Sequence, residues 1–337
     1  MAQFVAQRFL WLILVLFVVS AITFGLMRLV PGGPFATERG VPDTILRALE
    51  EKYNLTGTLI EQYAKWIGDI IVPRVTDDTF RPSAVNDYLI NIRLDFIKAD
   101  TDFRWMNFGP SLRIRSRTVN SIFEENLPIS LQLGTAALMV AMAIGVPAGI
   151  IAALNRNTIY DYTGMGVAII GVSIPVIIMG PLLQYLFGVQ WHVLPVSGWG
   201  KPENVIMPAF ALGFAQSALL ARLTRASLLQ VMNEDYIRTA RAKGLSERVV
   251  VLFHALKNSL IPVVTVLGPL FAALLTGTFV TETIFGIPGM GRFFVTSVTN
   301  RDYPVIMGTI LLYAGFLVLA NMVVDITYAW LDPRIRY

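Results

Sequence analysis

The chain has 337 residues, of which 55% are hydrophobic and only 15% are charged, and its mean hydropathy is +0.60. This composition is too apolar for an ordinary soluble domain and indicates a membrane protein. The net charge of +4 would suit nucleic acid, but the basic residues flank apolar runs, which favours a membrane surface and no nucleic-acid partner. The lack of cysteine excludes disulfides and thiolate chemistry.

Six uncharged runs are long enough to be transmembrane helices. The first has 19 residues and would cover about 28 Å as a helix, close to the roughly 30 Å of a hydrocarbon core. It is followed by "LMRLVPGGP" rather than by a small-residue cleavage site, so we expect a retained helix and not a signal peptide. The runs are residues 9–27, 129–154, 163–189, 205–221, 259–281 and 304–324, the fourth being the shortest.

Basic residues in short loops set the expected orientation, because Lys and Arg are enriched on the cytoplasmic side. Segment 222–258 carries seven of them, and the C-terminal tail adds Arg334 and Arg336. The expected protein is therefore a multi-pass membrane protein with both termini and segment 222–258 in the cytoplasm. We divide the chain into a first helix (1–30), an extracytoplasmic segment (31–128) and a five-helix core (129–337).

The segment 31–128 holds 12 basic and 14 acidic residues, which does not contradict an external location because long loops translocate regardless of charge. Its apolar spacing predicts helices over 42–55 and 59–71, and residues 72–85 are typical of a turn-rich connection. We expect an inserted domain of mixed structure.

Residues able to perform catalysis are scarce. His192 and His254, the only histidines, are expected on opposite sides of the membrane, and no zinc-ligand spacing or Walker A loop is present. We predict no catalytic, cofactor-binding or metal site. Arg28, Glu282 and Asp325 fall near predicted helix ends, where snorkelling or capping accounts for them. Five prolines interrupt the spans, as kinks or as cavity-lining positions: Pro147, Pro175, Pro181, Pro208 and Pro269.

Segment 222–258 has the pattern of a helical hairpin. Leu228, Met232, Tyr236 and Ala240 recur every fourth residue and predict one amphipathic helix over 227–243. Gly244 stands where a helix C-terminal glycine with positive φ would lie, and Ser246 can cap a second helix. The apolar face of that helix is Leu245, Val249, Leu252, Leu256 and Leu260. The loop by itself cannot bury this apolar stripe, which indicates that either a protein partner or anionic lipid covers it. The spacing alone does not distinguish the two.

A resemblance to a known family favours the protein partner over anionic lipid. "DYIRTARAKGL" followed by "HALKNSLIPVVTVLG" resembles the EAA-type coupling loop of ABC importer permeases of the dipeptide, oligopeptide and nickel group. Ala240, Gly244, His254 and Pro262 fall on positions of that motif. Motifs along most of the chain resemble the B-type permease of the group. They are "RLVPGGP", "LPISLQLGTAAL", "LPVSGW", "MPAFALG", "LARLTRASLL", "TETIFGIPGMGR" and "LDPRIRY". Segment 31–128 is expected to be longer than its counterpart in the family.

The resemblance implies an all-α type I ABC importer permease fold with six transmembrane helices, located in the inner membrane of a prokaryote. It also implies a peptide substrate, a second, C-type permease subunit, two ABC ATPase subunits that bind ATP and Mg²⁺, an extracytoplasmic solute-binding protein and surrounding lipid. "FGIPGMGRFF" is expected to form an external turn or part of a gate, through Pro288, Gly289 and Gly291. The residues expected to contact the ATPase are Asp235, Tyr236, Ala240, Arg241, Gly244, Leu245, Val249 and His254.

Three alternatives stay open at this point. A permease of the same group could carry nickel or another small solute. A secondary transporter would work alone on an ion gradient, but the scarcity of charge within the spans argues against it. A membrane scaffold would need no translocation path, which six proline-interrupted spans disfavour.

Overall fold

The computed structural model describes residues 2–29, 55–76, 88–93, 102–114 and 116–331. Five of the described helices are long and apolar enough to cross a membrane, and the number is six if one bent pair of helices is counted as a single span. The expected all-α membrane fold is thereby confirmed. The chain divides into two compact units, the first formed by residues 1–8, 129–291 and 316–337 and the second by 9–128 and 292–315. This division does not follow our three segments, because most of the first helix and residues 292–315 belong with the external segment.

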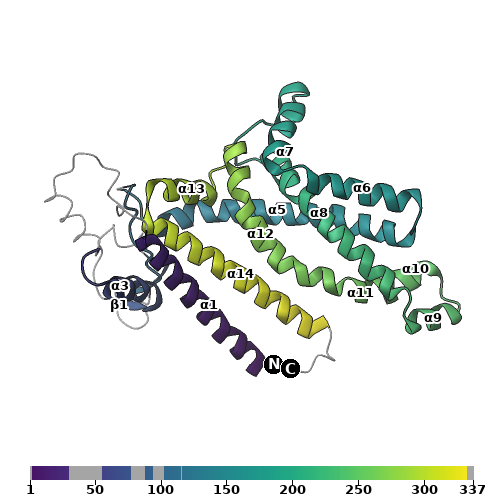
Figure 1. Ribbon diagram of the computed structural model, residues 1–337, viewed down its shortest axis with the longest axis horizontal. Coiled ribbons are helices and arrows are strands. Elements are labelled where there is room, and N and C mark those ends of the chain that lie inside the picture. Colours follow the sequence, from purple (N-terminus) through teal and green to yellow (C-terminus); the bar gives the residue numbers. More distant parts are fainter. Residues whose placement is uncertain (1, 30–54, 77–87, 94–101, 115, 332–337) are drawn as a thin grey trace. The chain divides into compact units, whose positions relative to one another are not determined.

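The first unit contains helices α5 (Val119–Leu154), α6 (Ile159–Ser173), α7 (Val176–Leu183), α8 (Glu203–Val231) and α12 (Ile261–Phe285). Helix α6 runs beside α8, and α8 packs against α12 (Figure 1). The buried core draws on α5, α7, α8 and α12. Its largest fully buried side chains include Leu133, Leu220, Leu274 and Phe285.

The apolar run 163–189, which we expected to be one span interrupted by its prolines, is sharply bent. Helix α6 ends at Ser173, and the pair formed by α6 and the segment Val176–Gln190, made of α7 and the π-helical turn η1 (Gln184–Gln190), is bent by 100°. Pro175 explains the break, since a residue before proline is pushed out of the helical region and Ile174 is extended. Pro181, Pro208 and Pro269 lie inside helices.

Helix α8 is longer than its 17-residue apolar run, with 29 residues. It packs against α5 through glycines that allow backbone contact. A Cβ on Gly213 would lie 2.3 Å from the carbonyl oxygen of Ala137, and one on Gly149 would lie 2.5 Å from that of Ala221. Small residues at such positions let two membrane helices approach closely.

The second unit contains α1 (Ala2–Leu29, mostly in this unit), α3 (Leu59–Ile71), a small sheet, α13 (Met290–Asn300) and the start of α14 (Tyr303–Leu331). The predicted helix over 59–71 is confirmed. It begins at a capping box in which Thr58 and Glu61 each accept a hydrogen bond from the other's backbone. The helix expected over 42–55 lies outside the described residues apart from Leu55, which the structure leaves non-helical.

Strands β1 (Arg74–Thr76), β2 (Ile90–Arg93) and β3 (Asp102–Trp105) form an antiparallel sheet in the order β1-β3-β2. Val75 pairs with Phe103, and Ile92 pairs with Phe103 from the other side. Three residues of the segment that we expected to be only turn-rich are therefore a strand. The mixed character expected of the external segment is present in these described residues.

Candidate functional site

The predicted hairpin is present, and it is built in more pieces than expected. Helix α8 ends at Val231, α9 spans Asp235–Ala242, and after Gly244 come α10 (Glu247–Val249), the π-helical turn η2 (Val250–Ala255) and α11 (Leu256–Ser259). We call residues 232–259 the coupling hairpin. Figure 1 shows α9 and α10 at the end of α8.

The single long helix expected over 227–243 was wrong, since a turn at residues 232–234 separates α8 from α9. The amide of Glu234 donates to the carbonyl of Val231, and the side chain of Asn233 donates to that of Leu229. Asn and Asp side chains compete for backbone groups and favour helix ends. The letters "NED" carried this signal, although the apolar spacing continued across them.

Gly244 ends α9 as predicted, with a φ of +77°. Its amide donates to the carbonyl of Arg241, and the amide of Leu245 donates to that of Ala240. These two bonds form a Schellman motif, which places a left-handed residue after the helix. A Cβ on Gly244 would meet no atom within 4 Å. Backbone conformation alone therefore requires glycine here.

An ion pair spans the Gly244 turn. The guanidinium of Arg241 donates from Nη2 to Glu247 Oε1 at 2.6 Å and from Nε to Oε2 at 3.1 Å. The hydrogen bond to Arg241 holds the pKa of the Glu247 carboxyl below its ordinary value, and the same bond raises the pKa of Arg241. Because both side chains are exposed, the pair contributes only about 0–1 kcal/mol to stability while it links the two sides of the turn.

The hairpin shares a small buried interior with α5 and α8, which agrees with our expectation that the loop cannot bury its apolar stripe by itself. The fully buried members of this interior are Leu228, Ile237, Val250 and Ala255, with Ala240 and Ala153 nearly so. The predicted stripes are confirmed at Leu228, Met232, Ala240 and Leu256, which lie in or against this interior. They were wrong at Tyr236 and Val249, in whose place Ile237 and Val250 are buried.

Two of the predicted contact residues lie on the outside: Tyr236 is 41% exposed and Leu245 is 39% exposed. Leu252, from the predicted apolar face of the second helix, is 58% exposed. Phe253, which the sequence reasoning missed, is 72% exposed. The predicted face was drawn with α-helical spacings of three and four residues, which do not include Phe253. Because η2 is π-helical, with i→i+5 hydrogen bonds, its exposed face is rotated relative to that of an α-helix. We call Tyr236, Leu245, Leu252 and Phe253 the apolar surface of the hairpin.

The remaining predicted residues have structural roles within the hairpin. Tyr236 accepts a hydrogen bond at 2.8 Å from the side-chain amide of Asn258, which joins α9 to α11. Asp235 lies in the first turn of α9 and pairs with Arg238 at the surface. His254 is half-buried in η2, and its Nδ1 lies 3.4 Å from the carbonyl oxygen of Val249.

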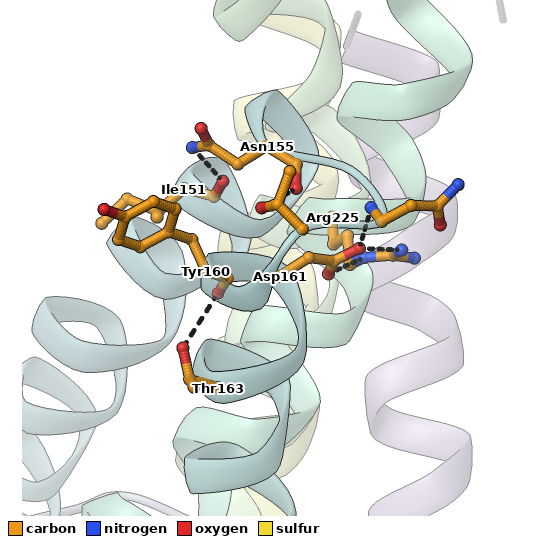
Figure 2. A network of polar contacts seen from close by, with 8 residues as sticks. Ile151, Asn155, Tyr160, Asp161, Thr163 and Arg225 are labelled. Carbon is orange, nitrogen blue, oxygen red and sulfur yellow. Dashed lines mark hydrogen bonds and ion pairs between the residues drawn. The ribbon is translucent and has the colours of Figure 1, made fainter.

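A buried ion pair lies near the same end of α8. Arg225 Nε and Nη2 each donate to one carboxylate oxygen of Asp161 at 2.7 Å. Asp161 also accepts from the amide of Asn157 at 3.0 Å, in the turn that joins α5 to α6. Figure 2 shows Asp161 and Arg225 pointing toward one another. The pair therefore fixes the α5–α6 turn to α8 ten residues before α9 begins. Sequence reasoning missed it, because 64 residues separate the partners.

The "FGIPGMGR" turn closes on a buried carboxylate. Glu282 Oε1 accepts from the hydroxyl of Ser130 at 2.6 Å, and Oε2 accepts from the amide of Gly291 at 2.7 Å. The Ser130 oxygen in turn accepts from the amide of Met290. Glu282 therefore caps the first residues of α13, as the expected capping role required, and it does not snorkel.

Gly289 and Gly291 are needed for this closure. A Cβ on Gly289 would lie 2.3 Å from the Glu282 carboxyl, and one on Gly291 would lie 2.4 Å from the Cα of Phe279. Pro288 precedes them in the same turn. These three residues form a tightly packed turn, and their expected participation in a gate stays a prediction. The side chain of Asp325 lies outside the described residues.

Comparison with known proteins assigns the fold and the family. Over 63% of this chain and 97% of the other, the structure is similar to the MetNI methionine ABC transporter in an inward-facing conformation, with a TM-score of 0.53 at 18% identity. Residues 145–337 match the family described as the binding-protein-dependent transport system inner membrane component, and residues 1–84 match its N-terminal family.

Two relatives align along the whole chain. The dipeptide transport system permease protein of Bacillus subtilis is 40% identical over 100% of this chain and 98% of that protein. The oligopeptide transport system permease protein of Escherichia coli is 39% identical over 100% of both. Because these alignments include 31–128, our expectation that this segment is unusually long was wrong. The chain belongs to the binding-protein-dependent inner membrane permeases and is a peptide-type permease subunit of an ABC importer.

Proposed function

We propose that this permease forms half of the translocation path of an ATP-driven importer of short peptides and that the coupling hairpin docks in a separate ATPase subunit. The names of the two relatives support dipeptides or oligopeptides rather than nickel as substrate. We propose as its partners a second, C-type permease subunit, two ATPases that bind ATP and Mg²⁺, and an extracytoplasmic solute-binding protein, with both termini in the cytoplasm.

One observation carries the docking proposal. The hairpin packs on α5 and α8 around a buried interior and still exposes Leu245, Leu252 and Phe253. Side chains that the fold does not need, gathered on a segment with a basic character, are typical of a surface that another protein covers.

Energies favour the apolar surface over the charges. Converting a 1:99 equilibrium between two conformations to 99:1 requires about 5.5 kcal/mol of differential interaction. An exposed ion pair such as Arg238–Asp235 contributes about 0–1 kcal/mol. Burying Leu252 and Phe253 contributes about 1.5–3 kcal/mol each. Two hairpins seated through these side chains can therefore couple nucleotide-driven closure of the ATPases to the permease pair.

Cysteine crosslinking tests the docking, because the chain has no native cysteine. Phe253→Cys should crosslink to a cysteine placed in the ATPase subunit of the assembled transporter. Val193→Cys, equally exposed in the loop before α8, is the matched control and should not. Absence of crosslinks from Phe253→Cys in every nucleotide state, together with quenching of a label there by a lipid-soluble quencher, would instead place the hairpin on the bilayer.

A further inference from the structure

The second unit contains a cavity of about 130 Å³ beside the end of α1. Five parts of the unit line it: the end of α1, Leu55, the inner face of α3, residues 108–112 and the start of α14. Arg28, Gln62, Lys65, Trp66 and Tyr303 are its polar lining residues other than Asp69. Neither the coupling hairpin nor the Glu282 turn contributes to it.

Three buried polar atoms of side chains that line this cavity lack a hydrogen-bond partner among the described residues. They are Gln62 Oε1, Trp66 Nε1 and the hydroxyl oxygen of Tyr303. Gln62 is 7% exposed and Tyr303 is 3% exposed. An unsatisfied buried polar group costs about 1–3 kcal/mol, so three around one cavity indicate a missing ligand.

Hydrogen bonds fix the orientation of the Gln62 side-chain amide and so determine which kind of partner its Oε1 needs. Its Nε2 donates to the carbonyls of Leu55 at 2.8 Å and Gly57 at 3.0 Å. The amide group therefore cannot rotate without losing both bonds. Oε1 is left as an acceptor that needs a donor from the ligand, while Trp66 N–H and Tyr303 O–H can donate to it.

The charges at the cavity select an anion. The guanidinium carbon of Arg28 lies 5.1 Å from the ring centre of Phe24 and 5.8 Å from that of Tyr303, so aromatic faces position it. Lys65 supplies a second cation, and the carboxylate of Asp69 is paired with Arg74. A planar guanidinium with a neighbouring ammonium is well suited to a phosphate group.

The surroundings of the cavity indicate the headgroup level of a membrane. Helix α1 exposes apolar side chains along its length to Leu26 and Leu29, just beyond Arg28. Helix α3 buries its other face in the unit and turns outward Ile60, which is 80% exposed, and Ile71, which is 57% exposed. An amphipathic helix with apolar side chains outward, and a Trp at its inner edge, is typical of the membrane–water interface.

We propose that this cavity binds the headgroup of a membrane phospholipid. Arg28 and Lys65 neutralise the phosphate, Trp66 and Tyr303 donate to its oxygens, and Gln62 Oε1 accepts from a hydroxyl or ammonium group of the headgroup. Phosphatidylglycerol and phosphatidylethanolamine carry such a donor, and phosphatidylcholine does not. The acyl chains lie along the exposed face of α1. The inference is independent of the proposed docking of the hairpin.

Native mass spectrometry of the intact transporter tests this proposal. We expect complexes reconstituted in nanodiscs of phosphatidylglycerol or phosphatidylethanolamine to retain one more lipid per permease than complexes from phosphatidylcholine. Tyr303→Phe and Lys65→Gln should each weaken retention of that lipid by about tenfold, the effect expected for one hydrogen bond to a charged group. Lys201→Gln, an exposed lysine of the other unit, is the control.

Two results would overturn the proposal. The first is equal lipid retention by Tyr303→Phe, Lys65→Gln and Lys201→Gln, since Tyr303→Phe removes only one oxygen atom and should fold normally. The second is displacement of the lipid by millimolar inorganic phosphate, or recovery of a bound peptide in its place. These would assign the cavity to a soluble phosphate or to a peptide.

Discussion

Gly244 is the residue at which conformation, and not space, dictates the amino acid. Its φ is +77°, and a Cβ added there would have no atom within 4 Å. A side chain would therefore strain the backbone without clashing with any neighbour. Backbone conformation and lack of space often act together at a glycine in a turn, and here the choice of substitution can separate them.

We expect Gly244→Val to abolish ATP-driven peptide uptake while ATP hydrolysis continues. A β-branched residue at positive φ costs about 1–3 kcal/mol, which would open the turn and misplace Leu245. Gly244→Asn is the matched control, because asparagine tolerates the left-handed region, and it should retain most of the uptake. Uptake and hydrolysis are measured in proteoliposomes. Equal uptake by the two variants would contradict the role of φ.

Gly289 presents the opposite case, in which space dictates the residue. We expect Gly289→Ala to lower the stability of the permease by about 1–3 kcal/mol, since its methyl group would overlap the Glu282 carboxyl. Thermal unfolding of the purified transporter measures the effect. Gly277→Ala, whose methyl group would lie 3.6 Å from Leu212, is the control and should unfold at the wild-type temperature. An unchanged unfolding temperature for both would mean that the turn moves away from Glu282 at little cost.

The pair Arg241–Glu247 predicts a response to acid. Because the folded-state pKa of Glu247 lies below its ordinary value of 4.5, the stabilisation is complete above that value and is lost as the pH falls through the lower, folded-state pKa. Amide hydrogen-exchange protection of the Gly244 turn, corrected for intrinsic rates, should be constant between about pH 5 and 8 and fall by less than about fivefold below pH 4.5. Glu247→Gln should remove this acid-dependent step. A step centred near neutral pH would point to another group.

At the scale of elements, the hairpin shows which features could be predicted from the sequence and which could not. The Gly244 turn and the helix at 59–71 were predictable, because a C-terminal glycine and a capping box are local signals. The exact set of buried residues was not. Ile237 and Val250 are buried in place of Tyr236 and Val249, because the chain breaks at Asn233 and forms a π-helical turn at 250–255, which the spacing of apolar residues does not reveal.

Contacts between distant elements escaped sequence reasoning for a different reason. Ser130, Glu282 and Gly291 meet only after α5 and α12 have packed, so no local pattern announces them. The same holds for Asp161 and Arg225. The bend at Pro175 was open to prediction as a kink, but its size depends on the neighbours of α7.

The Asp161–Arg225 pair makes α6 and α8 a single element near the hairpin. We expect Asp161→Asn to destabilise the permease by about 3 kcal/mol, since it leaves a partly buried guanidinium without its counter-ion. Glu125→Gln, which breaks the exposed pair with Arg117, should change stability by at most about 0.5 kcal/mol. Chemical unfolding in detergent compares the two. Similar losses would show that burial of the Asp161 pair adds nothing.

At the scale of the whole molecule, the sequence was most informative. Composition, six apolar runs and the distribution of Arg and Lys were sufficient for a polytopic membrane protein, since each depends on the bilayer and not on packing. The family followed from motifs spread from residue 28 to the C-terminus. The cavity beside Arg28 could not be predicted from the sequence, because the residues that surround it come from five separate parts of the chain.

The contact between α5 and α8 restricts how the permease can change conformation. Packed helices commonly rearrange by shear, sliding past one another in small steps. Here the backbone oxygens of Ala137 and Ala221 occupy the hollows left by Gly213 and Gly149. An axial shift of even one residue would bring a methyl-bearing side chain against a carbonyl. The two helices must therefore travel together, and any relative motion in this unit belongs to the interfaces that α7 and α12 make with them.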